Sequence, residues 1–411
     1  MSFSFLNGVL NISFDLIGTV TVALLFLLLG YWLKTKIYPL EKFCIPAPVV
    51  GGFIFVFIHF FIYLSGAAVF KFNATLQSVF MLAFFTSVGL STSLKILITG
   101  GKLLVLYWVV NVFVTILQTG IGVFIGPAVG LGPLYGIMSG PVALVGGHGG
   151  AAAYGSTLEG MGYPGASLVG LTAATFGLVV ASLVGGPLSR RLIEVHHLKP
   201  EEDASFNIDT SAYDSSKSQV EMTMFNVMSN IAALFVCMSL GSLITLWIGS
   251  LINMAIPTYV GAMFFAVLIR NLNDSMNLYP FSLKLNESLG DVCLGIYLSM
   301  ALITLKLWEL AGLAGPLLIT LIIQCVVLLI LTYFVIFRIL GKNYDAAVMC
   351  GGLIGHDIGS TPTAIANMTT VFQRYGMSKK AIIIVPIVGA FLIDVFYQPF
   401  TIYCINYFAN R

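Results

Sequence analysis

The stretch Gly-Gly-His-Gly-Gly-Ala-Ala-Ala-Tyr, from Gly146 to Tyr154, interrupts one of the apolar segments of this chain. A similar stretch, Gly-His-Asp-Ile-Gly-Ser-Thr-Pro-Thr from Gly355 to Thr363, follows about two hundred residues later. Backbone freed by such glycine and proline clusters is tolerated at membrane depth only where it is buried in protein or lines a wet cavity. Paired interruptions in corresponding places of two halves indicate the binding site of a secondary transporter.

The composition identifies the broad class of protein. The chain has 411 residues, of which 58% are hydrophobic and only 9% charged, whereas soluble domains carry roughly 25% charged residues. We therefore expect a polytopic membrane protein embedded in a lipid bilayer. The net charge of +2 is scattered between apolar runs and indicates no nucleic-acid partner. The six cysteines lie singly, without metal-ligand spacing, so no cofactor and no metal other than sodium is expected.

Apolar runs long enough to cross a bilayer determine the expected fold class. It is an all-α polytopic membrane protein with ten transmembrane helices in two inverted five-helix repeats, each with a re-entrant hairpin. The hairpins are expected at 132–162 and 344–372, which are apolar but rich in Gly, Pro, Ser, Thr and His. The expected spans are 12–33, 45–64, 76–94, 103–125, 166–189, 226–251, 256–270, 287–305, 313–337 and 381–405.

The distribution of basic residues predicts the orientation. With the N-terminus outside and a crossing at each span, sixteen of the 19 Lys and Arg residues lie in inner loops. The exceptions are Lys71, Lys306 and Arg411. Both termini are then outside, the first hairpin enters from the outer face, and the second enters from the cytoplasm.

The two halves align around shared landmarks. Pro46 and Pro257, which open corresponding spans, are 211 residues apart, and the hairpin histidines His148 and His356 are 208 apart. Because each half has an odd number of spans, the second half is inserted upside down, as in many transporters. We expect an N-terminal repeat at 1–193, a polar cytoplasmic linker at 194–221 and a C-terminal repeat at 222–411.

Several longer stretches resemble a known family. They are Met81–Leu90, Gly146–Gly149, Ala174–Leu178, Gly185–Pro187, Met300–Leu302, Leu305–Leu310, Gly341–Ala347, Thr361–Met368 and Val388–Asp394. Over nearly its full length the chain resembles the bacterial glutamate:sodium symporters, the ESS family. The resemblance implies sodium-coupled import of L-glutamate across the bacterial cytoplasmic (inner) membrane, with ten spans and two re-entrant loops.

One pair of residues departs from the family pattern. Family members usually have an aromatic residue and a glycine where this chain has His356 and Asp357, and Ser360 replaces an alanine. An acid beside an anion site could change the coupling ion, add a protonation step or shift the substrate. The alternative function is therefore a sodium- or proton-coupled carrier of another small dicarboxylate or acidic metabolite.

The substrate site is expected at the two hairpin tips. No Lys or Arg falls within the central part of any expected span, so helix N-termini, backbone N–H groups and hydroxyls must hold a substrate carboxylate. A glycine seam for helix packing is the structural alternative. The candidate substrate-binding residues are Gly146, Gly147, His148, Gly149, Gly150, Gly359, Ser360, Thr361, Pro362, Thr363 and, from the family-like stretch, Asn367.

The hairpin histidines allow more than one interpretation. His148 and His356 could be interior hydrogen bonders that tie each tip to its neighbours, or they could contact substrate. A role in proton coupling or specificity is a further hypothesis for His356 and Asp357. A metal site is not expected, because neither histidine has a carboxylate or cysteine cluster beside it.

Asp394 is the main candidate for sodium binding. A carboxylate within a span costs at least roughly 2.5–3.5 kcal/mol and usually marks an ion path, although helix capping or a dimer interface would also explain it. With no basic partner in its span, a bound sodium ion is the expected counter-charge. Hard oxygen ligands on two other spans, which could equally be helix-packing or snorkelling residues, complete the set: Thr86, Ser87, Asp291 and Ser299.

These residues distinguish a carrier from a channel and from an intramembrane enzyme. A channel would need a continuous wet path, and an intramembrane enzyme would need a nucleophile or a metal motif such as HExxH, which the hairpins lack. We therefore expect a non-enzymatic carrier that forms a homodimer and moves in an elevator-like way. The moving group is expected to hold both hairpins with the third and eighth spans, and the second, fourth, seventh and ninth spans are expected to be fixed.

Overall fold

The computed structural model describes residues 1–6, 9–42, 45–93, 101–200, 223–252, 256–310 and 312–409. Most of these residues are helical, which confirms the expected class of helical polytopic membrane protein. Seven helices among them are long and apolar enough to cross a membrane. They are Leu16–Lys36, Ala47–Leu64, Gly101–Ala128, Ala166–Val195, Met224–Ile252, Ala314–Ile339 and Lys379–Ala409.

Three further helices coincide with the other expected spans. They are α4 (Thr75–Ser91), α11 (Thr258–Met276) and α12 (Leu283–Ile303). The first has 17 residues, slightly fewer than the ~20 that usually cross a bilayer. The total of ten spans therefore stays a prediction, as does the inverted repeat. Residues 201–221 of the predicted linker lie outside the described residues, and its first two belong to the last turn of a helix.

The chain packs into two compact units, each of which takes elements from both halves of the sequence. Unit 1 comprises the described residues of Met1–Ile37, Pro46–Ile96 and Asp209–Trp308, and unit 2 those of Tyr38–Ile45, Leu97–Ile208 and Glu309–Arg411. The repeats at 1–193 and 222–411 are therefore not separate compact bodies.

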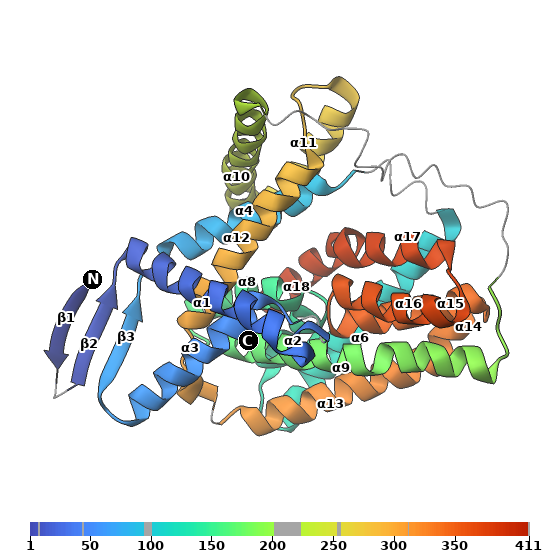
Figure 1. The fold of residues 1–411 in the computed structure, drawn as a ribbon, viewed down its shortest axis with the longest axis horizontal. Helices are drawn as coiled ribbons and strands as arrows, with labels where there is room; N and C mark the ends of the chain where they lie inside the picture. The colour runs from blue at the N-terminus through green and yellow to red at the C-terminus, as the bar shows by residue number, and fades with distance from the viewer. Residues whose placement is uncertain are drawn as a thin grey trace. The chain divides into compact units, whose positions relative to one another are not determined.

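Unit 1 contains a small sheet and six long helices (Figure 1). Strand β1 pairs antiparallel with β2, and β2 pairs parallel with β3. Its elements are β1 (Ser2–Leu6), β2 (Val9–Phe14), α1 (Leu16–Lys36), α3 (Ala47–Leu64), β3 (Ala68–Phe72), α4, α10 (Met224–Ile252), α11, α12 and the short η3 (Leu307–Leu310).

The sheet is a difference from the expected all-helical chain. The expected first span began at residue 12, but residues up to Phe14 are in a strand and α1 begins at Leu16. Asp15 causes the change, because its carboxylate accepts a hydrogen bond from the Gly18 N–H at 2.8 Å and caps the helix. The same bond lowers the pKa of the exposed Asp15 carboxyl.

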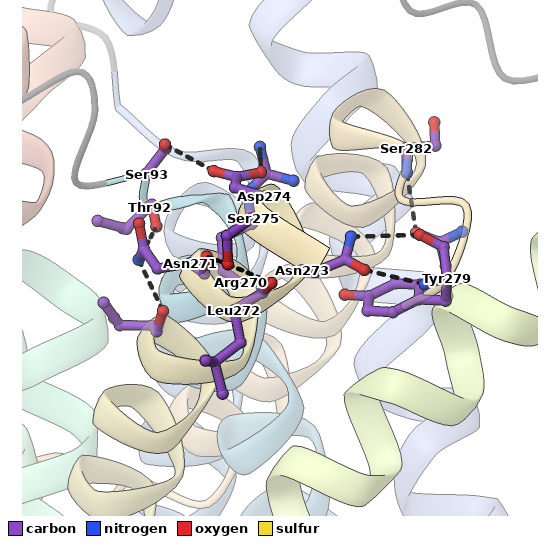
Figure 2. A network of polar contacts seen from close by, with 12 residues as sticks. Thr92, Ser93, Arg270, Asn271, Leu272, Asn273, Asp274, Ser275, Tyr279 and Ser282 are labelled. Carbon is purple, nitrogen blue, oxygen red and sulfur yellow. Dashed lines mark hydrogen bonds and ion pairs between the residues drawn. The ribbon is translucent and has the colours of Figure 1, made fainter. Parts of the chain in front are cut away.

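A polar network joins the ends of α4 and α11 within unit 1 (Figure 2). Arg270 Nη2 lies 3.2 Å from Asp274 Oδ1, and Ser93 Oγ donates to Asp274 Oδ2 at 2.7 Å. Asn271 Nδ2 donates to the Thr92 carbonyl at 3.2 Å. These contacts explain why α11 continues to Met276, six residues beyond the expected end of that span.

The prediction that the third and eighth spans group with the two hairpin segments is wrong for the packing of the structure. The hairpin segments pack in unit 2 with the fourth, fifth, ninth and tenth spans, whereas the third and eighth spans, α4 and α12, belong to unit 1. The reason is close helix packing: a Cβ on Gly89 of α4 would lie 2.2 Å from the Met263 carbonyl oxygen of α11. Asn286 of α12 donates to the Ser87 carbonyl of α4 at 2.8 Å.

Unit 2 holds both glycine-rich stretches (Figure 1). Helix α9 packs against α8, α15 and α16, and α6 packs against α7 and α13. The elements of unit 2 are α2 (Tyr38–Lys42), α6 (Gly101–Ala128), α7 (Pro133–Ile137), η1 (Met138–Val142), α8 (Gly147–Gly160), α9 (Ala166–Val195), α13 (Ala314–Leu331), η4 (Thr332–Ile336), α14 (Phe337–Ile339), α15 (Tyr344–Ile358), α16 (Thr361–Tyr375), α17 (Lys379–Ile387), η5 (Val388–Leu392) and α18 (Asp394–Ala409).

Candidate functional site

The first glycine-rich segment is a helix pair broken before α8. Gly140 leaves helical geometry with φ −95° and ψ −125°, and Gly147 has φ 59°, in the left-handed region that favours glycine. The N-cap of α8 is Gly146, which offers no side-chain acceptor to the first N–H groups of the helix. The positive end of the α8 dipole is therefore not offset by a side chain of its own N-cap residue.

The second segment is a helix pair broken between α15 and α16. Ser360 is the N-cap of α16, and its hydroxyl accepts a hydrogen bond from the Thr363 N–H at 3.4 Å. Pro362 lies in the first turn, where its missing N–H costs no helical hydrogen bond. Both α15 and α16 have 15 residues, about 22 Å of helix, which is less than the ~30 Å of a hydrocarbon core.

The two breaks meet inside unit 2. A Cβ placed on Gly147 would lie 3.8 Å from the carbonyl oxygen of Gly359. Helix α9 passes both breaks, because a Cβ on Gly177 would lie 2.1 Å from the Ile358 carbonyl oxygen and 2.8 Å from the Leu144 side chain. Two stretches about two hundred residues apart in the sequence thus form one site.

Tyr397 contributes to this site and was missed in the sequence. Its side chain is fully buried, and its hydroxyl has no hydrogen-bond partner among the described residues. A Cβ on Gly146 would lie 2.5 Å from that hydroxyl, and one on Gly150 would lie 3.1 Å from it. The hydroxyl therefore faces the uncapped start of α8. The spacing from Asp394, three residues earlier on the same helix face, was the available signal.

Asp394 lies where the last long helix is broken. The π-helical turn η5 separates α17 from α18, and Asp394 is the first residue of α18. Gln398 Nε2 is 3.3 Å from Asp394 Oδ1, and Tyr154 of α8 donates to Gln398 Oε1 at 2.6 Å. The carboxylate has no ion pair with any described residue, so it is a half-buried charge linked through Gln398 to the first hairpin segment.

His356 and Asp357 form a buried pair at the end of α15. His356 Nδ1 lies 2.8 Å from Asp357 Oδ1, and Tyr107 of α6 lies with its hydroxyl 2.7 Å from His356 Nε2. A Cβ on Gly389 would lie 2.9 Å from the imidazole, so this glycine allows η5 to approach. Together with Tyr107, the pair forms a tyrosine–imidazole–carboxylate arrangement that is buried among helices of unit 2.

Helix α6 presents a buried polar stripe that the sequence analysis did not use. Gln118 Nε2 donates to the Asp357 carbonyl at 2.8 Å, and Gln324 Nε2 of α13 donates to the Gln118 carbonyl at 2.9 Å. The helical spacing of these polar residues was a detectable signal. The stripe consists of Tyr107, Asn111, Thr115, Gln118 and Thr119.

Two candidate substrate residues make hydrogen bonds to neighbouring helices. His148 Nε2 is 3.0 Å from Thr175 Oγ1, and the single hydroxyl proton of Thr175 is donated to the Leu171 carbonyl. His148 Nε2 is therefore the donor in that pair. Asn367 Nδ2 donates to the Ala181 carbonyl of α9 at 3.1 Å and to the Gly351 carbonyl of α15 at 3.3 Å.

The four sodium candidates other than Asp394 belong to unit 1. The hydroxyls of Thr86 and Ser87 donate to carbonyls of their own helix at 2.7 Å. Ser299 is fully buried and its hydroxyl has no partner among the described residues, whereas Asp291 is exposed on α12. Asp394 and these four residues therefore do not share a compact unit.

The amino-acid sequence of the chain is similar to those of known transport proteins. The family described as "Sodium/glutamate symporter" matches residues 12–377 of the chain. A sodium/glutamate symporter from Haemophilus influenzae is 39% identical over 390 residues, which cover 94% of this chain and 96% of the relative. A sodium/glutamate symporter from Escherichia coli K12 is 36% identical over 383 residues, covering 93% and 95%.

Proposed function

Because the chain belongs to the sodium/glutamate symporter family, we propose that it couples sodium entry to the import of L-glutamate. The observation that carries the proposal is the meeting of two helix starts, α8 and α16, beside a tyrosine hydroxyl that has no hydrogen-bond partner and a carboxylate that has no ion pair among the described residues. The first three features suit an anion and the last suits a cation, so one site provides for both solutes of a symporter.

The substrate carboxylates are held at the two breaks. The N-terminal ends of α8 and α16 carry partial positive charge, and Gly146, Gly149 and Gly150 allow the substrate to approach the backbone. Tyr397 donates its hydroxyl proton to a substrate oxygen. His148 and Asn367 hold α8 and α16 against α9, so their contribution is positioning.

Sodium binds beside Asp394 in this proposal. An anionic substrate near an uncompensated carboxylate would be repelled strongly in a low dielectric, whereas a sodium ion on Asp394 would remove the repulsion. Sodium would then raise the affinity for substrate, and substrate would raise the affinity for sodium by the same factor. The buried hydroxyl of Ser299, with Thr86, Ser87 and Asp291, is the candidate for a further sodium position in unit 1.

Transport proceeds by relative movement of parts of the protein. The separate packing of units 1 and 2 supports an elevator-like mechanism in a homodimer, with unit 2 carrying the site. Both broken segments are re-entrant hairpins in this proposal, because their helices are too short to cross the hydrocarbon core singly. Cysteines at Gly150 and Ser360 are expected to react with membrane-impermeant thiol reagents, and substrate is expected to slow the reaction.

The decisive experiment is uptake into proteoliposomes under imposed sodium, proton or potassium gradients. Asp394→Asn is expected to raise the sodium concentration required for half-maximal L-glutamate uptake by about tenfold or more while the protein still folds, since the bound ion loses the carboxylate charge beside it. Asp345→Asn is the matched control, because that carboxylate pairs with Lys380 at 3.4 Å. Uptake by Asp394→Asn with wild-type sodium dependence would contradict the sodium assignment.

A second candidate function is favoured by one observation, the buried His356–Asp357 pair. A protonatable pair near the site would suit a carrier of another dicarboxylate or a proton-coupled carrier. Asp357→Gly is expected to leave the sodium requirement intact and to change the substrate preference or the pH profile. A panel of labelled acids distinguishes the two functions, because an unchanged panel and pH profile would leave the pair with a structural role only.

A further inference from the structure

A basic cavity of about 430 Å³ lies between the C-terminal ends of α9 and α16 in unit 2. This volume is within the ~300–1,000 Å³ usual for ligand pockets. Three arginines line it, Arg190, Arg191 and Arg374, together with one acid, Glu194, so the lining carries a net charge of +2. None of these residues belongs to the transport site proposed above.

The acid in the cavity is already shared among its neighbours. Glu194 Oε1 accepts from Arg190 Nε at 2.9 Å and from the Tyr375 hydroxyl at 2.7 Å, and Arg374 Nη2 is 3.8 Å away. Arg191 has no ion pair with any residue that the structure describes. Glu194 therefore contacts Arg190 and Arg374, and one acid among three arginines leaves the lining with a net charge of +2.

The arginines remain accessible. The side chains of Arg190 and Arg374 are 52% and 58% exposed. The cavity is also lined by apolar residues, Gly186 and Pro187 of α9 and Val371 of α16, which we call its floor. A Cβ on Gly186 would meet no atom within 4 Å, which shows that the floor is open. A basic rim over an apolar floor suits an amphiphilic anion.

We propose that this cavity binds a phosphate-bearing anion. Guanidinium groups match phosphate oxygens in a fork geometry and remain charged at all relevant pH values. Three arginines and one glutamate give the cavity a net charge of +2, which fits the one to two negative charges of a phosphate group. Basic pockets near the cytoplasmic ends of membrane helices bind lipid headgroups in this way, and the basic-residue distribution predicts that side for these helix ends.

The test measures binding, not transport, so it is independent of the proposed function. Purified protein is incubated with phosphatidylglycerol or phosphatidylcholine in detergent, and retained lipid is counted by native mass spectrometry. The double variant R191Q/R374Q keeps the contacts from Arg190 and Tyr375 to Glu194. It is expected to bind phosphatidylglycerol about 30-fold more weakly, from about fivefold for each surface arginine.

Two further variants make the experiment specific. Arg338→Gln removes one positive charge from an exposed residue of unit 2 outside the cavity, and is expected to leave binding unchanged. Gly186→Leu keeps every charge but fills the floor, and is expected to weaken lipid binding. Melting temperatures show whether each variant is folded.

Inorganic phosphate distinguishes the sources of the ligand. If millimolar phosphate displaces phosphatidylglycerol, free phosphate is sufficient for binding in the cavity. If it does not, the ligand is the whole lipid headgroup, with its glycerol against the floor. The proposal is overturned if R191Q/R374Q binds as wild type does or if R338Q is equally impaired. It is also overturned if phosphatidylcholine is retained as well as phosphatidylglycerol, or if glutamate displaces the ligand and phosphate does not.

Discussion

The two helices that follow the breaks, α8 and α16, differ in whether the N-cap side chain accepts a hydrogen bond from the N–H groups of the first turn. At α16, the hydroxyl of Ser360 accepts from the Thr363 N–H, so the chain supplies its own cap. At α8, the N-cap is Gly146, which has no side chain that could accept from those N–H groups. An uncapped helix start is a better receptor for an anion than one that is already capped.

The surroundings of the two breaks reinforce this difference. The unpartnered hydroxyl of Tyr397 faces the start of α8, whereas the residues before α16 include the buried His356–Asp357 pair, which carries its own acid. In the proposed function, the first break therefore holds a substrate carboxylate more strongly than the second, which also closes the site around it. Three substitutions test this division, in order of decreasing effect.

Gly146→Ala is expected to have the largest effect. Its Cβ would lie 2.5 Å from the Tyr397 hydroxyl and 2.7 Å from the Val142 carbonyl oxygen, and a backbone oxygen cannot move aside cheaply. L-Glutamate uptake should fall by at least about tenfold at equal protein levels. Gly160→Ala is the matched control, because a Cβ at that glycine of α8 meets nothing within 4 Å. Equal uptake by Gly146→Ala and Gly160→Ala would refute the assignment of the substrate carboxylate to the first break.

Tyr397→Phe is expected to act on binding and not on folding. The hydroxyl has no partner among the described residues, so its loss should leave the melting temperature unchanged. A hydrogen bond to a charged group contributes about 1.5–3 kcal/mol, so the KM for glutamate should rise at least about tenfold. Tyr154→Phe removes a hydroxyl bonded to Gln398 at 2.6 Å and should lower stability instead. An unchanged KM for Tyr397→Phe would exclude the hydroxyl from the site.

Ser360→Ala is expected to have the smallest effect on transport. Removing this N-cap should reduce the free energy of unfolding by about 1 kcal/mol and change the KM by less than about threefold. Ser360→Thr should restore the stability, because threonine also caps helices. Thermal unfolding and uptake are measured on the same preparations. A KM change larger than that of Tyr397→Phe would reverse the assignment of roles to the two breaks.

Much of the site could be predicted from local sequence. Glycine and proline clusters end helices wherever they occur, so the breaks at Gly146–Gly150 and Gly355–Thr363 were found directly. Asp394 was found because an acid in an apolar run is rare. Tyr397 and Gln398 were missed, since a tyrosine or glutamine on a helix has no local feature that separates a ligand from a packing residue.

The membrane class, the helical content, the family and the two breaks were determined by the sequence itself, because hydropathy, glycine and proline act within a few residues. Only the tertiary structure decided that α4 and α12 pack apart from the broken segments, and that Gly147 lies beside Gly359. Close backbone approach at glycines such as Gly89 and Gly177 selects these partners. Such complementarity joins residues far apart in the chain, and no local pattern records it.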